Sequence, residues 1–229
     1  MGSIYKLYQH KNELFVDSFD DIILKLMQKS QNSKLKSLLF CGCEPGVGTT
    51  TIAINIAVSL ARGNNKTLLI DSDMRKSAKS KRLSEESQFG LSDFIAGNNT
   101  IEDIVNRTNF DNLDYITCGT QSSQSVKLLM FRRLNNFISS LYESYDFILF
   151  DSPSLDAVND SIAISILIDG IFLISELGRT TKINIRKTVQ QFSESSNKIL
   201  GMLVNKVDEP KYRMYMRNYD YFYKNREKS

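Results

Sequence analysis

A glycine-containing turn between an apolar strand and an apolar helix constrains the fold of this chain more than any other feature. Residues 37–41 form a short apolar run, residues 50–61 show helical apolar spacing, and Gly42-Cys-Glu-Pro-Gly-Val-Gly-Thr-Thr joins them. This order has the outline of a P-loop, whose backbone N–H groups surround phosphate oxygens at the start of a helix. It predicts a nucleotide site at the end of the first strand of an α/β sheet.

The turn departs from the usual P-loop at two positions. In the pattern G-x-x-x-x-G-K-[ST], the lysine reaches the terminal phosphates and the hydroxyl residue binds Mg²⁺. Thr49 stands at the lysine position and Cys43 at the first glycine. Losing one charge-assisted hydrogen bond costs roughly 1.5–3 kcal/mol, so we expect weakened binding of ATP and Mg²⁺. The predicted nucleotide-binding residues are Gly46, Val47, Gly48, Thr49, Thr50 and Thr51, with Thr50 also a metal ligand.

Short apolar runs alternate with helical patterns along the rest of the chain. Residues 14–28 predict an N-terminal helix. Further helices are predicted at 126–145, 161–168 and 183–192, and further strands at 67–71, 113–117, 147–151, 170–175 and 199–205. Such alternation indicates a mostly parallel sheet with helices on both faces, which binds ligands at the carboxyl ends of its strands. The fold class is therefore α/β of the P-loop NTPase type.

Three segments are expected along the chain. Residues 1–34 form an N-terminal helical segment, residues 35–207 a single P-loop NTPase-like domain, and residues 208–229 a flexible tail. The tail holds half of the ten tyrosines, interleaved with basic residues. They are Tyr212, Tyr215, Tyr219, Tyr221 and Tyr223.

Composition excludes several classes of function. A net charge of +3 gives no case for nucleic acid as a partner. No apolar run approaches the roughly 18 residues of a membrane span, and the polar start is no signal peptide, so we expect a cytosolic protein. Cys41, Cys43 and Cys118 lack metal-type spacing and are interpreted as packing and loop residues.

Acidic residues follow two of the predicted strands. Asp71 ends the strand at 67–71, Asp73 lies two residues beyond it, and Asp151 ends the strand at 147–151. Carboxylates at such positions can hold Mg²⁺ or accept a proton from an incoming hydroxyl. We predict that these three aspartates are catalytic and that Asp71 and Asp151 are also metal ligands.

The combination resembles the bacterial tyrosine kinases (BY-kinases) of capsule and exopolysaccharide synthesis. The resemblance is carried by residues 44–48, by Asp71-Ser-Asp-Met-Arg, by Asp151-Ser-Pro, by residues 200–205 and by the terminal tyrosines. It implies that the tail tyrosines are phosphoacceptors, that Asp71 activates the tyrosine hydroxyl, and that Asn205 lies near the adenine. It also implies a membrane activator, a polysaccharide co-polymerase subunit, that recruits the protein to the inner face of the membrane.

The chain also departs from the family. Its members carry a Glu-x-x-Arg-x-x-Arg pattern that joins subunits into a ring, and here Asp20 and Ile23 replace the two arginines. A monomer, a small homo-oligomer or a pairing with an active kinase homologue is therefore expected. Three interpretations remain open: a tyrosine kinase impaired by Thr49, a pseudokinase that serves as a regulatory phosphoacceptor subunit, and a MinD/ParA-like positioning ATPase. Glu44, where the last class has its signature lysine, argues against it.

Overall fold

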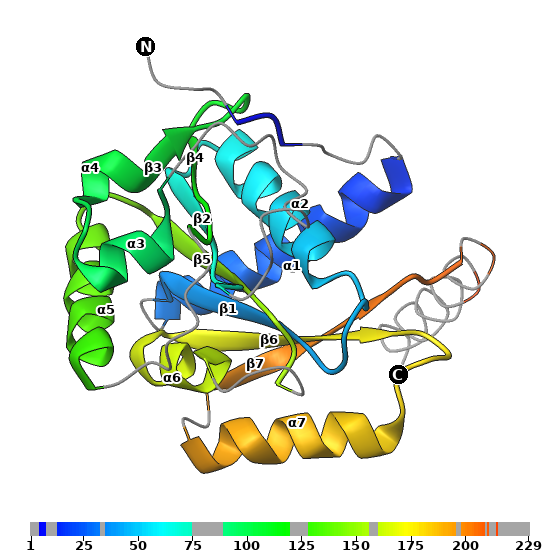
Figure 1. The fold of residues 1–229 in the computed structure, drawn as a ribbon. Coiled ribbons are helices and arrows are strands. Elements are labelled where there is room, and N and C mark those ends of the chain that lie inside the picture. Colours follow the sequence, from blue (N-terminus) through cyan, green and yellow to red (C-terminus); the bar gives the residue numbers. More distant parts are fainter. Residues whose placement is uncertain are drawn as a thin grey trace.

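A computed structural model describes residues 5–7, 13–32, 35–74, 89–119, 128–155, 160–195, 198–208, 210 and 214. These residues form one seven-stranded sheet with the strand order β3-β4-β2-β5-β1-β6-β7 (Figure 1). The strands are β1 Ser37–Gly42, β2 Thr67–Asp71, β3 Val105–Arg107, β4 Leu113–Ile116, β5 Phe147–Ser152, β6 Gly170–Glu176 and β7 Ile199–Asn205. Neighbouring strands are parallel except β3 and β4, which confirms the predicted mostly parallel sheet.

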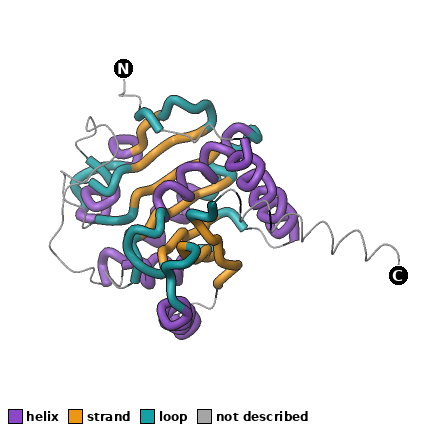
Figure 2. Tube along the Cα trace, turned by 90° about the vertical axis from the view of Figure 1, so that its right-hand side faces the viewer, coloured by secondary structure: helices purple, strands orange, loops and turns teal. Residues whose placement is uncertain are grey.

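Helices cover both faces of this sheet, as predicted (Figure 2). They are α1 Glu13–Asn32, α2 Thr49–Arg62, α3 Leu91–Ala96, α4 Ile101–Ile104, α5 Leu128–Leu141, α6 Asp160–Leu167 and α7 Lys182–Ser195. Apolar residues of α1 and α2 pack on one face, and those of α3, α5, α6 and α7 pack on the other. Among the described residues, no helix combines the length and apolar composition that a membrane span requires.

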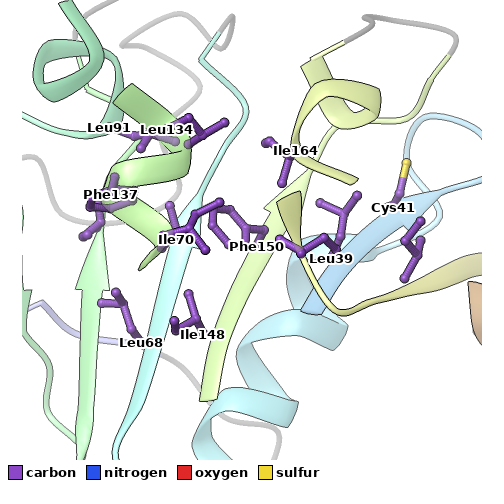
Figure 3. Close-up of a cluster of buried hydrophobic side chains, with 14 of the residues drawn as sticks. Leu39, Cys41, Leu68, Ile70, Leu91, Leu134, Phe137, Ile148, Phe150 and Ile164 are labelled. Carbon is purple, nitrogen blue, oxygen red and sulfur yellow. The ribbon is translucent and has the colours of Figure 1, made fainter. Parts of the chain in front are cut away.

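Two apolar clusters hold these layers together. On the face of α5 and α6, Phe150 and Ile70 of the sheet lie against Phe137, Leu134 and Ile164 (Figure 3). A separate cluster on the opposite face joins the sheet to α2 and α1. Burying a side chain of this size contributes about 1.5–3 kcal/mol, so the central strands form a rigid base for the loops at their carboxyl ends.

Apolar side chains of the N-terminal helix α1 are part of the cluster that contains α2. Phe19, Ile23 and Leu26 form an apolar stripe with helical spacing on α1, and all three are buried in the same cluster as α2. The stripe is therefore occupied by contacts within the chain. Upstream of it, Tyr5 bridges to Thr108 beside β3, a pairing that was not predicted.

Candidate nucleotide-binding site

The predicted P-loop lies between β1 and α2, at the centre of the sheet. β1 is fully buried between β5 and β6, and its pairing with β6 continues into the loop, where Cys43 N donates to Ile174 O at 2.8 Å. At the other end, Ile52 N donates to Gly48 O at 3.1 Å and starts the helix. The loop is thus anchored on both sides by regular structure.

Two glycines in the left-handed backbone region shape the loop. Gly46 has φ 80° and Gly48 has φ 90°, a region that favours glycine. A Cβ on Gly48 would overlap the Asn205 side chain, whose Nδ2 donates to Val47 O at 2.8 Å. Asn205, expected near the adenine, therefore contacts the loop backbone directly.

The start of α2 has the donor set that a phosphate group requires. Gly48 is its N-cap and provides no side-chain cap, and its first turn holds no acidic residue. The first N–H groups of a helix, with the positive end of its dipole, favour an anion. The Thr49 side chain turns back toward the end of β1, since a Cβ on Gly42 would lie 2.8 Å from Thr49 Oγ1. These residues fit a bound phosphate, but without the lysine.

Asp71 and Asp151 lie side by side at the ends of two adjacent parallel strands. They are Cα partners in the register of β2 and β5, so both side chains point to the same face of the sheet. Phe40, also in register with Asp151, packs in the cluster that contains α2, which identifies this face as the one carrying α2. Asp151 is buried and Asp71 half-buried. The predicted pair of carboxylates therefore adjoins the helix that the P-loop begins.

The backbone after β2 is tied to the same pair. Ser72 donates to Asp151 O through its N–H at 2.9 Å and its hydroxyl at 2.8 Å. Asp73 N donates to Asp71 Oδ1 at 3.0 Å, which places the third predicted aspartate in the same turn. Burial, followed by the charges of Asp71 and Asp151, raises the pKa of Tyr115 well above its ordinary value. Tyr115, which lies on β4, is thus a neighbour of these two carboxylates that no motif indicated.

Glu44 points toward α7. Its Oε1 accepts from Thr180 Oγ1 at 2.7 Å and its Oε2 accepts from Asn184 Nδ2 at 3.1 Å. Helix α7 packs on the opposite face of the sheet from α2, because Phe192 belongs to the cluster of α5 and α6. The acidic side chain is thereby held away from the side of the loop that faces the aspartates.

Two basic residues that no sequence motif indicated contact the outer side of the loop. Arg179 follows β6 and donates to Pro45 O at 3.1 Å, and Lys206 follows β7 and donates to Gly46 O at 3.0 Å. They share no motif with the loop. Only their place in the sequence could have indicated them, because both follow strands whose carboxyl ends lie at the same edge of the sheet as the loop.

The predicted site residues fall into three groups. The loop residues 46–51 and Asn205 are in one place, and the three aspartates are beside them. No three His, Cys, Asp or Glu side chains of the described residues could together hold a metal ion. A Mg²⁺ ion at Thr50, Asp71 and Asp151 would thus need phosphate and water oxygens as well. The five predicted phosphoacceptor tyrosines of the tail lie outside the described residues.

Residues 39–202 match the family model described as an AAA domain. The chain is 35% identical over 176 residues to the tyrosine-protein kinase CpsD of Streptococcus pneumoniae serotype 4, covering 76% of this chain and 78% of that protein. It is 28% identical over 198 residues to the putative tyrosine-protein kinase EpsB of Ralstonia nicotianae, which covers 86% of this chain but 26% of that longer protein.

Solved structures also resemble this chain. The BceF tyrosine kinase domain superposes with a TM-score of 0.72 at 26% identity, over 84% of this chain and 78% of that one. The septum site-determining protein MinD of Pyrococcus horikoshii, complexed with Mg-ADP, superposes with a TM-score of 0.59 at 21% identity, over 76% and 72%. The likeness to MinD is one of fold alone.

Proposed function

The chain belongs to the bacterial tyrosine kinase (BY-kinase) family, and we propose that it transfers a phosphoryl group from Mg·ATP to tyrosine hydroxyls. The observation that carries the proposal is the in-register pair Asp71 and Asp151 on the face of α2. Phosphoryl transfer depends mainly on positioning and on electrostatic stabilisation, which a backbone cradle beside two carboxylates supplies.

Each residue of the site has a separate role in this proposal. The N–H groups of residues 46–51 bind the phosphates, while Thr50, Asp71 and Asp151 provide oxygens for Mg²⁺, which supplies charge neutralisation. A tyrosine with a pKa of about 10 is protonated at neutral pH, so its proton needs an acceptor. Asp71 is half-buried and thus reachable by a hydroxyl, which supports its role as that acceptor. Asp73 holds the turn around it.

We propose that Thr49 impairs this activity. Its short side chain, directed toward the end of β1, carries no charge to the γ-phosphate. Since charge develops there in the transition state, the lost stabilisation lowers turnover as well as affinity. This observation also favours the alternative function, a pseudokinase that serves as a regulatory phosphoacceptor. The orientation of Glu44 toward α7 argues against a MinD/ParA-like positioning ATPase, in which a lysine acts from that position.

The proposed substrates are the tail tyrosines at 212, 215, 219, 221 and 223, in a cytoplasmic protein. CpsD is named as a tyrosine-protein kinase and EpsB as a putative one, and the resemblance to the BY-kinases implies a role in capsule and exopolysaccharide synthesis. We therefore propose recruitment to the inner face of the membrane by an activator of the polysaccharide machinery. A tail tethered close to the site raises the effective concentration of its tyrosines.

Ring assembly through α1 is not part of the proposal. Ile23, at the second arginine position of the family pattern, is 7% exposed and packs in the cluster of α2. Asp20, at the first position, is exposed but has the opposite charge to arginine. We propose that the isolated protein is a monomer or small oligomer. A stable ring of many subunits in light scattering would contradict this.

The test combines binding and turnover. Calorimetry with Mg·ATP on wild-type protein measures affinity, and mass spectrometry follows tail phosphorylation in the presence of an activator fragment. We expect slow phosphorylation by wild type, faster phosphorylation by Thr49→Lys, and none by Asp71→Ala. Equal rates in wild type and Thr49→Lys would refute the impairment. Nucleotide binding without phosphorylation in either would favour the pseudokinase.

A further inference from the structure

Three consecutive carbonyl groups of the P-loop are each held by a side chain from another part of the chain. Pro45 O accepts from Arg179 Nη2 at 3.1 Å and Gly46 O accepts from Lys206 Nζ at 3.0 Å. Val47 O accepts from Asn205 Nδ2 at 2.8 Å. The three donors lie at or just after the carboxyl ends of β6 and β7, so these hydrogen bonds hold the outer side of the loop to that part of the sheet.

The two cations are themselves fixed by one carboxylate. Glu176, the last residue of β6, accepts from Lys206 Nζ at 2.8 Å and from Arg179 Nη1 at 3.1 Å. Lys206 reaches the loop from a left-handed backbone conformation with φ 56°, which is uncommon for a residue with a Cβ. Asn205 Oδ1 accepts the Lys206 N–H at 2.8 Å and supports that conformation. Residues in sparsely populated backbone regions cluster at functional sites.

Holding these carbonyls also directs the amides that follow them. A trans peptide is planar, and its C=O and N–H point in opposite directions. When the C=O groups of residues 45, 46 and 47 are drawn outward, the N–H groups of Gly46, Val47 and Gly48 are turned to the other side. Those amides are among the ones that the proposed function assigns to phosphate binding.

We propose that Arg179, Lys206 and Asn205 form an outer clamp that preorganises the P-loop amides for phosphate. This inference rests on the proposed function. The clamp lowers the cost of ordering the loop when a nucleotide binds, and so offsets part of what the chain loses at Thr49. Arg179 and Lys206 are positioning residues, because they contact the loop backbone on its outer side.

The decisive measurement requires no nucleotide. Backbone ¹⁵N relaxation gives order parameters, which are about 0.85 for rigid and below about 0.6 for flexible amides. We expect Lys206→Met to lower the value of Val47, whose N–H shares a peptide plane with Gly46 O, into the flexible range, and Lys206→Arg to restore it. Lys198→Met is the matched control, since Lys198 Nζ likewise donates to backbone carbonyls, here Ile166 O and Ile168 O, at the opposite end of the sheet. Unchanged order parameters in Lys206→Met would overturn the clamp.

Nucleotide affinity provides the second measurement. We expect Lys206→Met to weaken Mg·ADP and Mg·ATP by the same factor, about fivefold for a half-exposed contact, with adenosine unaffected. A much greater loss for Mg·ATP than for Mg·ADP would overturn the positioning role, because Lys206 would then act on the γ-phosphate itself. If wild-type protein binds no nucleotide, the proposed function fails, and the order parameters still decide whether the clamp exists.

Discussion

Thr180 donates a hydrogen bond of 2.7 Å to Glu44, joining the start of the P-loop to the turn between β6 and α7. Asn184 of α7 donates to the other carboxylate oxygen at 3.1 Å. An acidic residue within a phosphate-binding loop would repel its ligand if it faced the same side as the amides. The structure resolves this conflict, because the carboxylate has its partners on the other face of the sheet.

Substitutions of Glu44 should therefore affect the stability of the fold more than the binding of nucleotide. We expect Glu44→Gln to change the Mg·ADP affinity by less than about threefold, since the screened charge is directed away from the phosphates. Glu44→Ala should lower the free energy of unfolding by about 1 kcal/mol, because Thr180 and Asn184 lose their shared acceptor. Calorimetry and urea denaturation measure the two effects. A tenfold gain of affinity in Glu44→Gln would show that the carboxylate opposes the ligand.

Gly48 and Gly178 provide a matched pair for testing the contact between the loop and β7. Both have positive φ, 90° and 77°, so alanine brings a backbone cost of roughly 1–2 kcal/mol at either position. A Cβ at Gly178 meets nothing within 4 Å, whereas at Gly48 it would overlap Asn205. We expect Gly48→Ala to be the more destabilising by about 1–3 kcal/mol, through steric overlap and loss of the bond to Val47 O. Equal losses in denaturation experiments would contradict the close packing.

The sequence predicts the central part of this fold well because local and long-range signals agree there. β1, β5 and β6 are continuous apolar runs between helices, and burial on both faces explains that pattern. The loop and the aspartates then lie close together, because each follows or ends a parallel strand and the carboxyl ends of these strands share one edge of the sheet. The predicted α/β class and the neighbourhood of Asp71 and Asp151 follow from this alone.

Other features have no comparable local signal. β3 has three residues, too few to show a period, and it is fixed by pairing with β4 and by Tyr5. The clamp residues Arg179 and Lys206 lie far from the loop in sequence. Their roles depend on hydrogen bonds to backbone carbonyls, which any loop residue could provide. Only the fold shows which carbonyls they contact.

The buried thiols should make stability depend on alkaline pH. Burial raises the pKa of Cys41 from 9.0 to about 12, and burial also raises that of Cys43. In the unfolded chain the thiols ionise near pH 9, so the folded state loses relative stability as the pH rises above 9. Integrating over the one pH unit from 9 to 10 gives a loss of about 1.4 kcal/mol for Cys41 at pH 10. Urea denaturation at pH 8 and pH 10 should show a smaller difference for Cys41→Ala than for wild type, and equal differences would contradict this.

The titration of the Glu176 carboxyl at acidic pH provides a further test of the clamp. The hydrogen bond from Lys206 is the main cause that lowers the pKa of its carboxyl below 4.5, opposed by desolvation and aided by Arg179. A lowered pKa means that the interaction is fully present above the ordinary value and is lost as the pH falls through the lowered one. The clamp contacts should therefore be constant from pH 6 to pH 8. In ¹³C carboxyl titrations, Lys206→Met should raise the pKa of Glu176 more than Arg179→Met does, while Lys198→Met leaves it unchanged. An unshifted titration in Lys206→Met would show that the carboxylate does not hold this lysine in solution.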